Sequence, residues 1–254
     1  MPARAPEGPP PAPVVQRLRL RFARRGRLRF SSHRDFQRAF ERALRRAGVP
    51  TGFSAGFTPH PKVSYAGAAP TGVASEAEYV EVGVTEPCEP DAVRVALDAA
   101  LPPGLDVLEV VEATPGTSLA DRLEASVYEV VLPGVSPAEA GRAVTLFLAA
   151  ETVEVERMTK TGLRRLDART AVCSLRLVER VAGPGPTAGA TACAILRTVV
   201  RHATPGVRPD DVLAALRSTA DLAPPEPPQV TRLAQGPLDA DADDVSDPLA
   251  PDRA

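Results

Sequence analysis

Residues 17–22 alternate strictly between basic and apolar side chains, and this pattern constrains the fold more than any other feature of the chain. The apolar positions are Leu18, Leu20 and Phe22, and the positions between them are Arg17, Arg19 and Arg21. Because side chains alternate across a strand with a period of two, the segment predicts a half-buried strand with one cationic face. Such a face needs water, acidic side chains or an anionic partner against it.

The cationic strand belongs to a basic segment in a chain that is otherwise acidic. The 254 residues carry a formal net charge of −2, yet residues 15–62 hold 12 Arg and Lys62 against only Asp35 and Glu41, a net charge of +11. Six of the seven Phe lie in the same segment. This asymmetry predicts a polyanionic partner for one subregion. The alternative is that the arginines solvate surface faces or pair with acids elsewhere in the fold.

The order of the predicted elements indicates the fold class. The first half predicts a strand at 15–22 continuing into a hairpin strand at 27–30, a helix from Ser32 to about residue 47, strands at 62–66 and 79–84, a helix at 90–100 and a strand at 105–111. The second half predicts strands at 126–132, 152–157, 171–178, 191–200 and 229–233, with helices at 137–150 and 209–218. We therefore expect an α+β protein of two tandem ferredoxin-like (βαββαβ) domains with antiparallel sheets. Each sheet would then have helices on one face and leave the other face free.

Composition predicts where these domains begin and end. Residues 1–13 contain six Pro and predict a disordered arm. The first domain is expected over 14–115 and the second over 119–237. Residues 238–254 hold six Asp against one Arg and predict an acidic disordered tail.

Several classes of protein are disfavoured by what the chain lacks. No apolar run approaches the roughly 20 residues that span a bilayer, and no signal peptide is recognisable, so we expect a cytoplasmic protein without a membrane partner. The three cysteines, Cys88, Cys173 and Cys193, form no CxxC pair and predict neither disulfides nor a metal cluster. No known catalytic motif occurs, and we expect no cofactor and no metal.

Three groups of basic residues are candidates for contact with nucleic acid, because guanidinium groups offer paired donors to phosphate and keep their charge. The strand face is expected to carry Arg17, Arg19, Arg21, Arg27 and Arg29. The outer side of the first helix carries Arg34, Arg38, Arg42 and Arg45. A basic turn in the second half carries Lys160, Arg164, Arg165 and Arg169. The alternatives are pairing of the strand arginines with acids such as Glu81, cover by the second domain, and a simply solvated turn.

The loop at 52–62 combines two glycines, two prolines and two phenylalanines. Its Phe53 and Phe57 would either fill the core or present rings on which bases stack. Just before the helix, Ser32 is the predicted N-cap and Asp35 its partner. We expect His33, Asp35, His60 and Lys62 to converge at this helix N-terminus in one pocket that binds phosphate or carboxylate.

The full set expected around this pocket is Ser32, His33, Asp35, Gly56, His60, Lys62, Ser75 and Glu78. Any catalysis would use His33, His60 or Lys62, with imidazole as general acid or base and the ammonium stabilising charge. In the alternative interpretation, Asp35 and His60 only hydrogen-bond to hold the loop against the helix.

A set of residues in these segments has a distinctive spacing: Arg29, Phe30, Ser32, His33, Asp35, Arg38, Arg42, Arg45, Arg46, Gly56, Phe57, Pro59, His60, Lys62, Ser64, Gly72, Ser75, Glu78 and Tyr79. In this spacing the chain resembles the radical-SAM-linked protein family, a bacterial-type domain family of unknown function. Residues 160–169 and 207–209 resemble further segments of it. The chain has no CxxxCxxC motif, so the resemblance implies the stand-alone form, which acts beside a separate radical SAM protein. Its members tend to be linked with ribosomal-protein and ribonuclease genes, which agrees with work on RNA.

Three functions follow from these observations. The first is an RNA-binding accessory protein linked to a radical SAM enzyme in RNA modification, processing or ribosome-related work. The second is a metal-independent endoribonuclease resembling the CRISPR repeat-processing enzymes, which also pair ferredoxin-like domains. The third is a subunit that docks only on protein. We favour the first, because it uses the basic segment directly.

Overall fold

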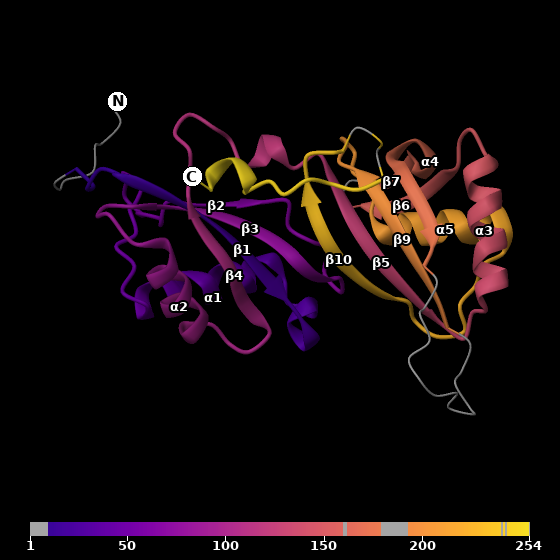
Figure 1. Ribbon diagram of the computed structural model, residues 1–254, viewed down its shortest axis with the longest axis horizontal. Coiled ribbons are helices and arrows are strands. Elements are labelled where there is room, and N and C mark those ends of the chain that lie inside the picture. The colour runs from indigo at the N-terminus through magenta and orange to yellow at the C-terminus, as the bar shows by residue number, and fades with distance from the viewer. Residues whose placement is uncertain (1–9, 160–161, 179–192, 240, 242, 254) are drawn as a thin grey trace. The chain divides into compact units, whose positions relative to one another are not determined.

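The computed structural model describes residues 10–159, 162–178, 193–239, 241 and 243–253 (Figure 1). The chain divides into two units, one of Met1–Arg122 with Pro248–Ala254 and one of Leu123–Asp247. Both are mixed α+β with largely antiparallel sheets, which confirms the predicted class. In the described part of the chain, no helix is long and apolar enough to cross a membrane.

The first unit contains the elements β1 (Gln16–Arg24), η1 (Gly26–Phe30), α1 (His33–Arg46), β2 (Val63–Ala66), β3 (Ala74–Val84), α2 (Pro90–Ala100), β4 (Leu105–Glu112), η2 (Ala120–Arg122) and η3 (Ala250–Asp252). Its strands pair in the order β4-β1-β3-β2, and every pairing is antiparallel. The chain therefore places its first strand in the middle of the sheet, between β4 and β3.

One face of this sheet packs on both helices, which lie on the same side of it in Figure 1. The alternation in β1 explains why, since Leu18, Leu20 and Phe22 all point into the core against α1 and α2. Phe22 stacks on Phe36 of α1 with ring centroids 4.5 Å apart. The three intervening arginines therefore face away from the helices, as the alternation predicts.

Two local predictions in the first unit are wrong. Residues 27–30 form no hairpin strand, because Gly26 adopts φ +55° and successive backbone bonds, Leu28 to Arg25 and Ser31 to Leu28, wind the 3₁₀ helix η1. Strand β3 begins at Ala74 rather than at residue 79. Residues 74–78 look polar enough for a loop, but in the structure they pair with the end of β1.

The second unit contains the elements β5 (Ala125–Pro133), α3 (Pro137–Ala149), β6 (Glu154–Thr159), β7 (Gly162–Asp167), α4 (Ala168–Ala171), β8 (Val172–Leu177), β9 (Cys193–Arg201), α5 (Pro209–Ala220) and β10 (Gln229–Gly236). Its main sheet has the order β10-β5-β9-β8, again antiparallel throughout. Strands β6 and β7 form a separate hairpin outside that sheet. Helix α3 has a side-chain cap, because Ser136 Oγ accepts a hydrogen bond from the Glu139 amide.

The end of the chain is more ordered than its composition indicates. Leu238 and Val245 form a bridge and pack on the second sheet beside Ala125 and Val127. Leu249 is fully buried. The acidic segment expected to be disordered therefore covers one sheet and then joins the first unit as Pro248–Ala254. Of the arm expected at residues 1–13, residues 1–9 lie outside the described part of the chain.

The aromatic core of the first unit supports one stability prediction. Phe40 is fully buried and contacts Phe22, Phe36 and Tyr65. Phe40→Ala is expected to lower the free energy of unfolding of this unit by about 3–5 kcal/mol, because it removes apolar contact and leaves a cavity. Urea unfolding followed by circular dichroism measures the change. Phe57→Ala, at a ring that is 71% exposed, is the matched control and should stay within about 0.5 kcal/mol.

Candidate nucleic-acid interface

The arginines on the sheet face are neutralised by neighbouring acids. Arg17 pairs with Glu81 at 2.8 Å, and Arg21 lies 3.9 Å from Glu109. Arg27 and Arg29 do not belong to this face, because they lie on η1 instead of a strand. Of the five arginines expected on the sheet face, only Arg17, Arg19 and Arg21 lie there. Each of these three is close to a carboxylate of the same chain.

Arg19 is the most tightly held of the three. Its side chain has no exposed surface and pairs with Glu81 at 3.0 Å and with Asp252 at 2.8 Å. It also donates to the Thr117 carbonyl at 2.6 Å. Asp252 in turn pairs with Arg122 at 2.6 Å. Arg19 is thus enclosed by a loop and by the end of the chain and is not available to a ligand.

Asp252 keeps its charge although it is buried. Burial by itself would raise the pKa of this carboxyl, but hydrogen bonds from Arg122, the Thr114 amide and Arg19 outweigh it and hold the pKa well below its usual range. The segment Pro248–Ala254 is therefore fastened to the sheet by a charged group with three donors.

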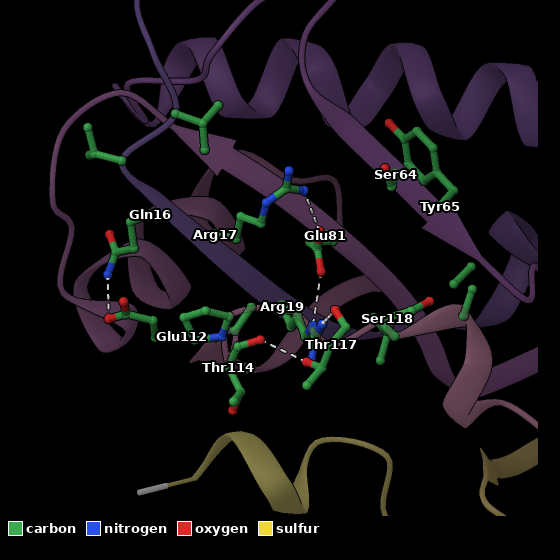
Figure 2. A pocket seen from close by; sticks show the side chains of 18 residues that line it. Gln16, Arg17, Arg19, Ser64, Tyr65, Glu81, Glu112, Thr114, Thr117 and Ser118 are labelled. Atoms are coloured by element: carbon green, nitrogen blue, oxygen red, sulfur yellow. Dashed lines mark hydrogen bonds and ion pairs between the residues drawn. The ribbon is translucent and has the colours of Figure 1, made fainter.

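A cavity of about 650 Å³ lies beside this network on the open face of the sheet. Figure 2 shows Arg17, Glu81, Gln16 and Glu112 around it, with hydroxyl groups along its lower edge and at its right. Its polar lining includes Gln16, Arg17, Arg19, Ser64, Glu81, Glu112, Thr114, Thr117 and Ser118. The two arginines and two glutamates balance, so this sheet-face cavity offers no net attraction to a polyanion.

Removing the Asp252 carboxylate tests the network. Asp252→Asn leaves Arg19 buried without its full counter-charge, so we expect the free energy of unfolding of the first unit to fall by about 3 kcal/mol. Urea unfolding measures it. Asp121→Asn, at an exposed neighbour in the same unit, is the control. Equal stability of the two variants would show that the buried pair is not stabilising.

The same carboxyl predicts a pH dependence. Because its pKa is lower in the folded than in the unfolded chain, its contribution is complete above about pH 5 and is lost as the pH falls further. The free energy of unfolding of the wild type should therefore decline more steeply between about pH 5 and pH 2 than that of Asp252→Asn. Parallel curves for the two proteins would contradict this assignment.

The arginines on α1 differ from those on the sheet, because none of them forms an ion pair within the part of the chain that the structure describes. The basic face of α1 consists of the exposed residues Arg34, Arg38, Arg42, Arg45 and Arg46. Among the described residues none of these five forms an ion pair; Arg45 and Arg46 donate only to the carbonyls of Glu41 and Ala100. This face therefore keeps its cationic charge for a partner.

Helix α1 starts as the sequence predicts. Ser32 Oγ accepts from the Asp35 amide at 3.2 Å and donates to the Asp35 carboxylate at 2.7 Å, which confirms the cap. His33 is exposed, lies 3.0 Å from the Gln37 side chain and packs edge-on against Tyr65. The carboxylate of Asp35 is thus committed to the cap, and His33 lies along the first turn of the helix.

The loop that follows α1 is a closed ladder. Lys62 donates its amide to Gly52, Phe53 and Pro61 form a bridge, and the Ser54 amide donates to the His60 carbonyl at 2.8 Å. Gly56 turns the tip with φ +134°, a conformation that favours glycine. The 52–62 loop is therefore held in shape before any partner arrives.

Two phenylalanines of this loop face solvent. Phe57 at the tip is 71% exposed and Phe53 is 40% exposed. An exposed ring on a backbone that is already ordered is available for stacking at little further entropic cost. Of the two interpretations of these residues, the structure therefore favours the surface one over filling of the core.

A second cavity of about 170 Å³, the α1–loop cavity, lies between the helix and this loop. Its lining residues are Glu41, Leu44, Arg45, Thr51, Phe53, Pro59, His60 and Pro61. Glu41 and Arg45 come from successive turns of α1 and share one side of the helix. The cavity thus joins the basic face of α1 to the aromatic loop.

The cavity at the 52–62 loop includes one of the two histidines expected in a shared pocket. His60 lines the α1–loop cavity, next to the second half of α1, whereas His33 lies on the first turn and is not part of its lining. A pocket shared by His33 and His60 stays a prediction. Lys62 is exposed just before β2. In the described part of the chain, no group of three or more His, Cys, Asp or Glu is placed to hold a metal.

The remaining residues expected in that pocket have a structural role. Glu78 is buried and accepts from the Ala69 amide, and Ser75, also buried, accepts from the Ala77 amide. Next to them Arg24, which the sequence analysis did not single out, is 3% exposed and donates to three carbonyls, those of Ala69, Pro70 and Val73. These contacts hold the 67–73 segment against β3.

The basic turn of the second unit does not form a single cluster. Arg165 pairs with Glu156 at 3.0 Å, while Arg164 is exposed on β7. Arg169 lies on α4, outside the β6-β7 hairpin, and its guanidinium packs over the Phe147 ring at 5.8 Å. Lys160 lies outside the described residues.

The sequence analysis did not single out three residues that matter for the charge of these surfaces. Arg122 and Asp252 belong to the Arg19 network, and Glu41 lines the α1–loop cavity. Asp252 is one of six Asp in residues 238–254, and nothing in the sequence distinguishes it from the others. No sequence pattern around Arg122 indicates a specific contact. For Glu41 there is such a pattern, because it and Asp35 are the only acids in the basic segment 15–62. An isolated acid among so many arginines is a reason to look for a specific contact.

Comparison with known proteins adds the family. A family model described as "Uncharacterized protein conserved in bacteria (DUF2344)" matches residues 17–209. The matched range begins in β1, includes α1 and the 52–62 loop, and ends at the start of α5. No curated protein matches the chain.

Proposed function

The chain belongs to this family of uncharacterised proteins conserved in bacteria, and we propose that it binds single-stranded RNA through the basic face of α1 and the 52–62 loop. One observation carries the proposal: five arginines on α1 are exposed and unpaired among the described residues, while those of the sheet are met by acids. Unpaired guanidinium groups bind phosphate without first giving up an internal partner.

The form of the surface favours single strands. Phe53 lines the α1–loop cavity together with Arg45, and Phe57 is exposed at the tip of the same loop. Aromatic rings beside a basic track are the usual platform for unstacked bases. The basic face alone would suit any polyanion. The rings add a preference for a chain whose bases are accessible.

The strand orders β4-β1-β3-β2 and β10-β5-β9-β8 support the further proposal that both units are ferredoxin-like, with the β6-β7 hairpin inserted in the second. In our proposal the protein works in the cytoplasm beside a separate radical SAM protein, as the family resemblance implies. The endoribonuclease alternative lacks a specific observation, because the α1–loop cavity is lined by His60 and not by His33.

Neutralising the helix tests the function. The triple variant Arg34→Gln, Arg38→Gln, Arg42→Gln is expected to weaken binding of a labelled mixed-sequence RNA single strand roughly 100-fold, or about 1 kcal/mol per lost contact. The slope of log K against log salt should fall by about 2, since each lost single-strand phosphate contact removes about 0.7. Fluorescence polarisation at several salt concentrations measures both.

The matched control is the double variant Arg17→Gln, Arg21→Gln, which removes two partly exposed arginines from the sheet. Its RNA affinity and salt slope should equal those of the wild type. If the control loses binding and the helix variant keeps it, the interface lies on the sheet. If neither variant changes binding, the basic segment does not contact RNA.

A further inference from the structure

The α1–loop cavity has the size and walls of a site for one planar ring system. An apolar cavity of about 150 Å³ is enough to hold benzene, and this one measures about 170 Å³. Its apolar lining comes from Phe53, Pro59, Pro61 and the buried Leu44. Exposed residues such as Arg45 and His60 lie on its lining, so a ring can enter from solvent.

The cavity is also formed in advance. The ladder between Gly52 and Lys62 and between Ser54 and His60 fixes the loop wall. The Gly52 amide donates a further hydrogen bond to the Gly83 carbonyl of β3, at 2.8 Å. On the other wall, Leu44 is anchored in the core of the first unit. Binding in such a site requires little ordering of the protein.

The polar groups of the cavity distinguish between bases. Glu41 forms no ion pair among the described residues, and an ionised carboxylate only accepts hydrogen bonds. Guanine presents two adjacent N–H donors on its Watson–Crick edge, whereas adenine and cytosine present one donor beside an acceptor that a carboxylate repels. Arg45, the second charged group from α1, is the side chain type that pairs best with O6 and N7 of guanine.

The position of the cavity connects it to the phosphate contacts. Arg34, Arg38, Glu41 and Arg45 follow one another at helical spacing on one side of α1, over roughly 16 Å from the first to the last. A strand whose phosphates lie along Arg34 and Arg38 therefore arrives at Glu41 and Arg45.

We propose that the α1–loop cavity is a binding site for a single unstacked guanine of the RNA strand, with Glu41 on its Watson–Crick edge and the ring against Phe53. This inference rests on the proposed RNA function and adds a base preference to it. Phosphate contacts position the strand, and the cavity reads one base.

The test compares four labelled oligonucleotides, a uridine strand and the same strand with one central guanosine, adenosine or cytidine. With the full-length wild type, fluorescence polarisation should show roughly tenfold tighter binding of the guanosine strand, the discrimination of one well-formed pair of hydrogen bonds. Glu41→Gln should reduce this preference to about twofold or less, because the guanosine strand loses affinity relative to the uridine strand.

The control is Glu89→Gln, an exposed glutamate of the same unit whose side chain makes no capping bond. It should keep the preference for guanosine. The second variant is Phe53→Leu, which removes the aromatic wall without changing the charge. It should weaken binding of the guanosine strand more than binding of the other three strands. Melting curves confirm that each variant is folded.

The outcomes separate the two proposals. Equal binding of the four strands by the wild type overturns the guanine site and leaves the RNA function standing. If both Glu41→Gln and Phe53→Leu keep the guanosine preference, the base is recognised elsewhere on the protein. That result also overturns the guanine site. If the wild type binds none of the strands, the RNA function and the guanine site are both wrong.

Discussion

The arrangement of the first unit depends on one buried guanidinium. Arg19 lies in the middle strand of the sheet, and a buried charge is tolerated only where partners surround it. Those partners are Glu81 on the neighbouring strand, the Thr117 carbonyl and Asp252 near the end of the chain. Satisfying Arg19 therefore brings a loop and the last residues of the chain onto the open face of the sheet.

This constraint separates two sets of arginines that look alike in the sequence. On the sheet, each cation has a carboxylate nearby, and the cavity beside them is neutral overall. On α1, the arginines form no ion pair among the described residues, although Glu41 lies on the same side of the helix. The sheet network consequently serves stability, while the helix retains charge that an RNA backbone can use. The family match spans both sets and assigns no activity to either.

The candidate site combines a rigid helix with a loop that is itself braced. Backbone bonds across the 52–62 loop and from Gly52 to Gly83 keep Phe53 and Phe57 at the surface without help from a partner. Exposed apolar surface rimmed by polar side chains is typical of binding sites. The cavity beside this loop, with Glu41 and Arg45 on its lining, is the place where we propose that one guanine binds.

Local sequence patterns were enough to predict most of the elements, the two faces of β1 and the cap of α1, because periodicity and capping act within a few residues. The predictions failed at 27–30 and 74–78, where η1 and the start of β3 depend on neighbours. Which arginines pair with acids, and that His60 rather than His33 lines the α1–loop cavity, follow from tertiary contacts. The physical reason is distance along the chain: Arg19 meets partners 62 and 233 residues away, and no local pattern encodes which charges meet in space.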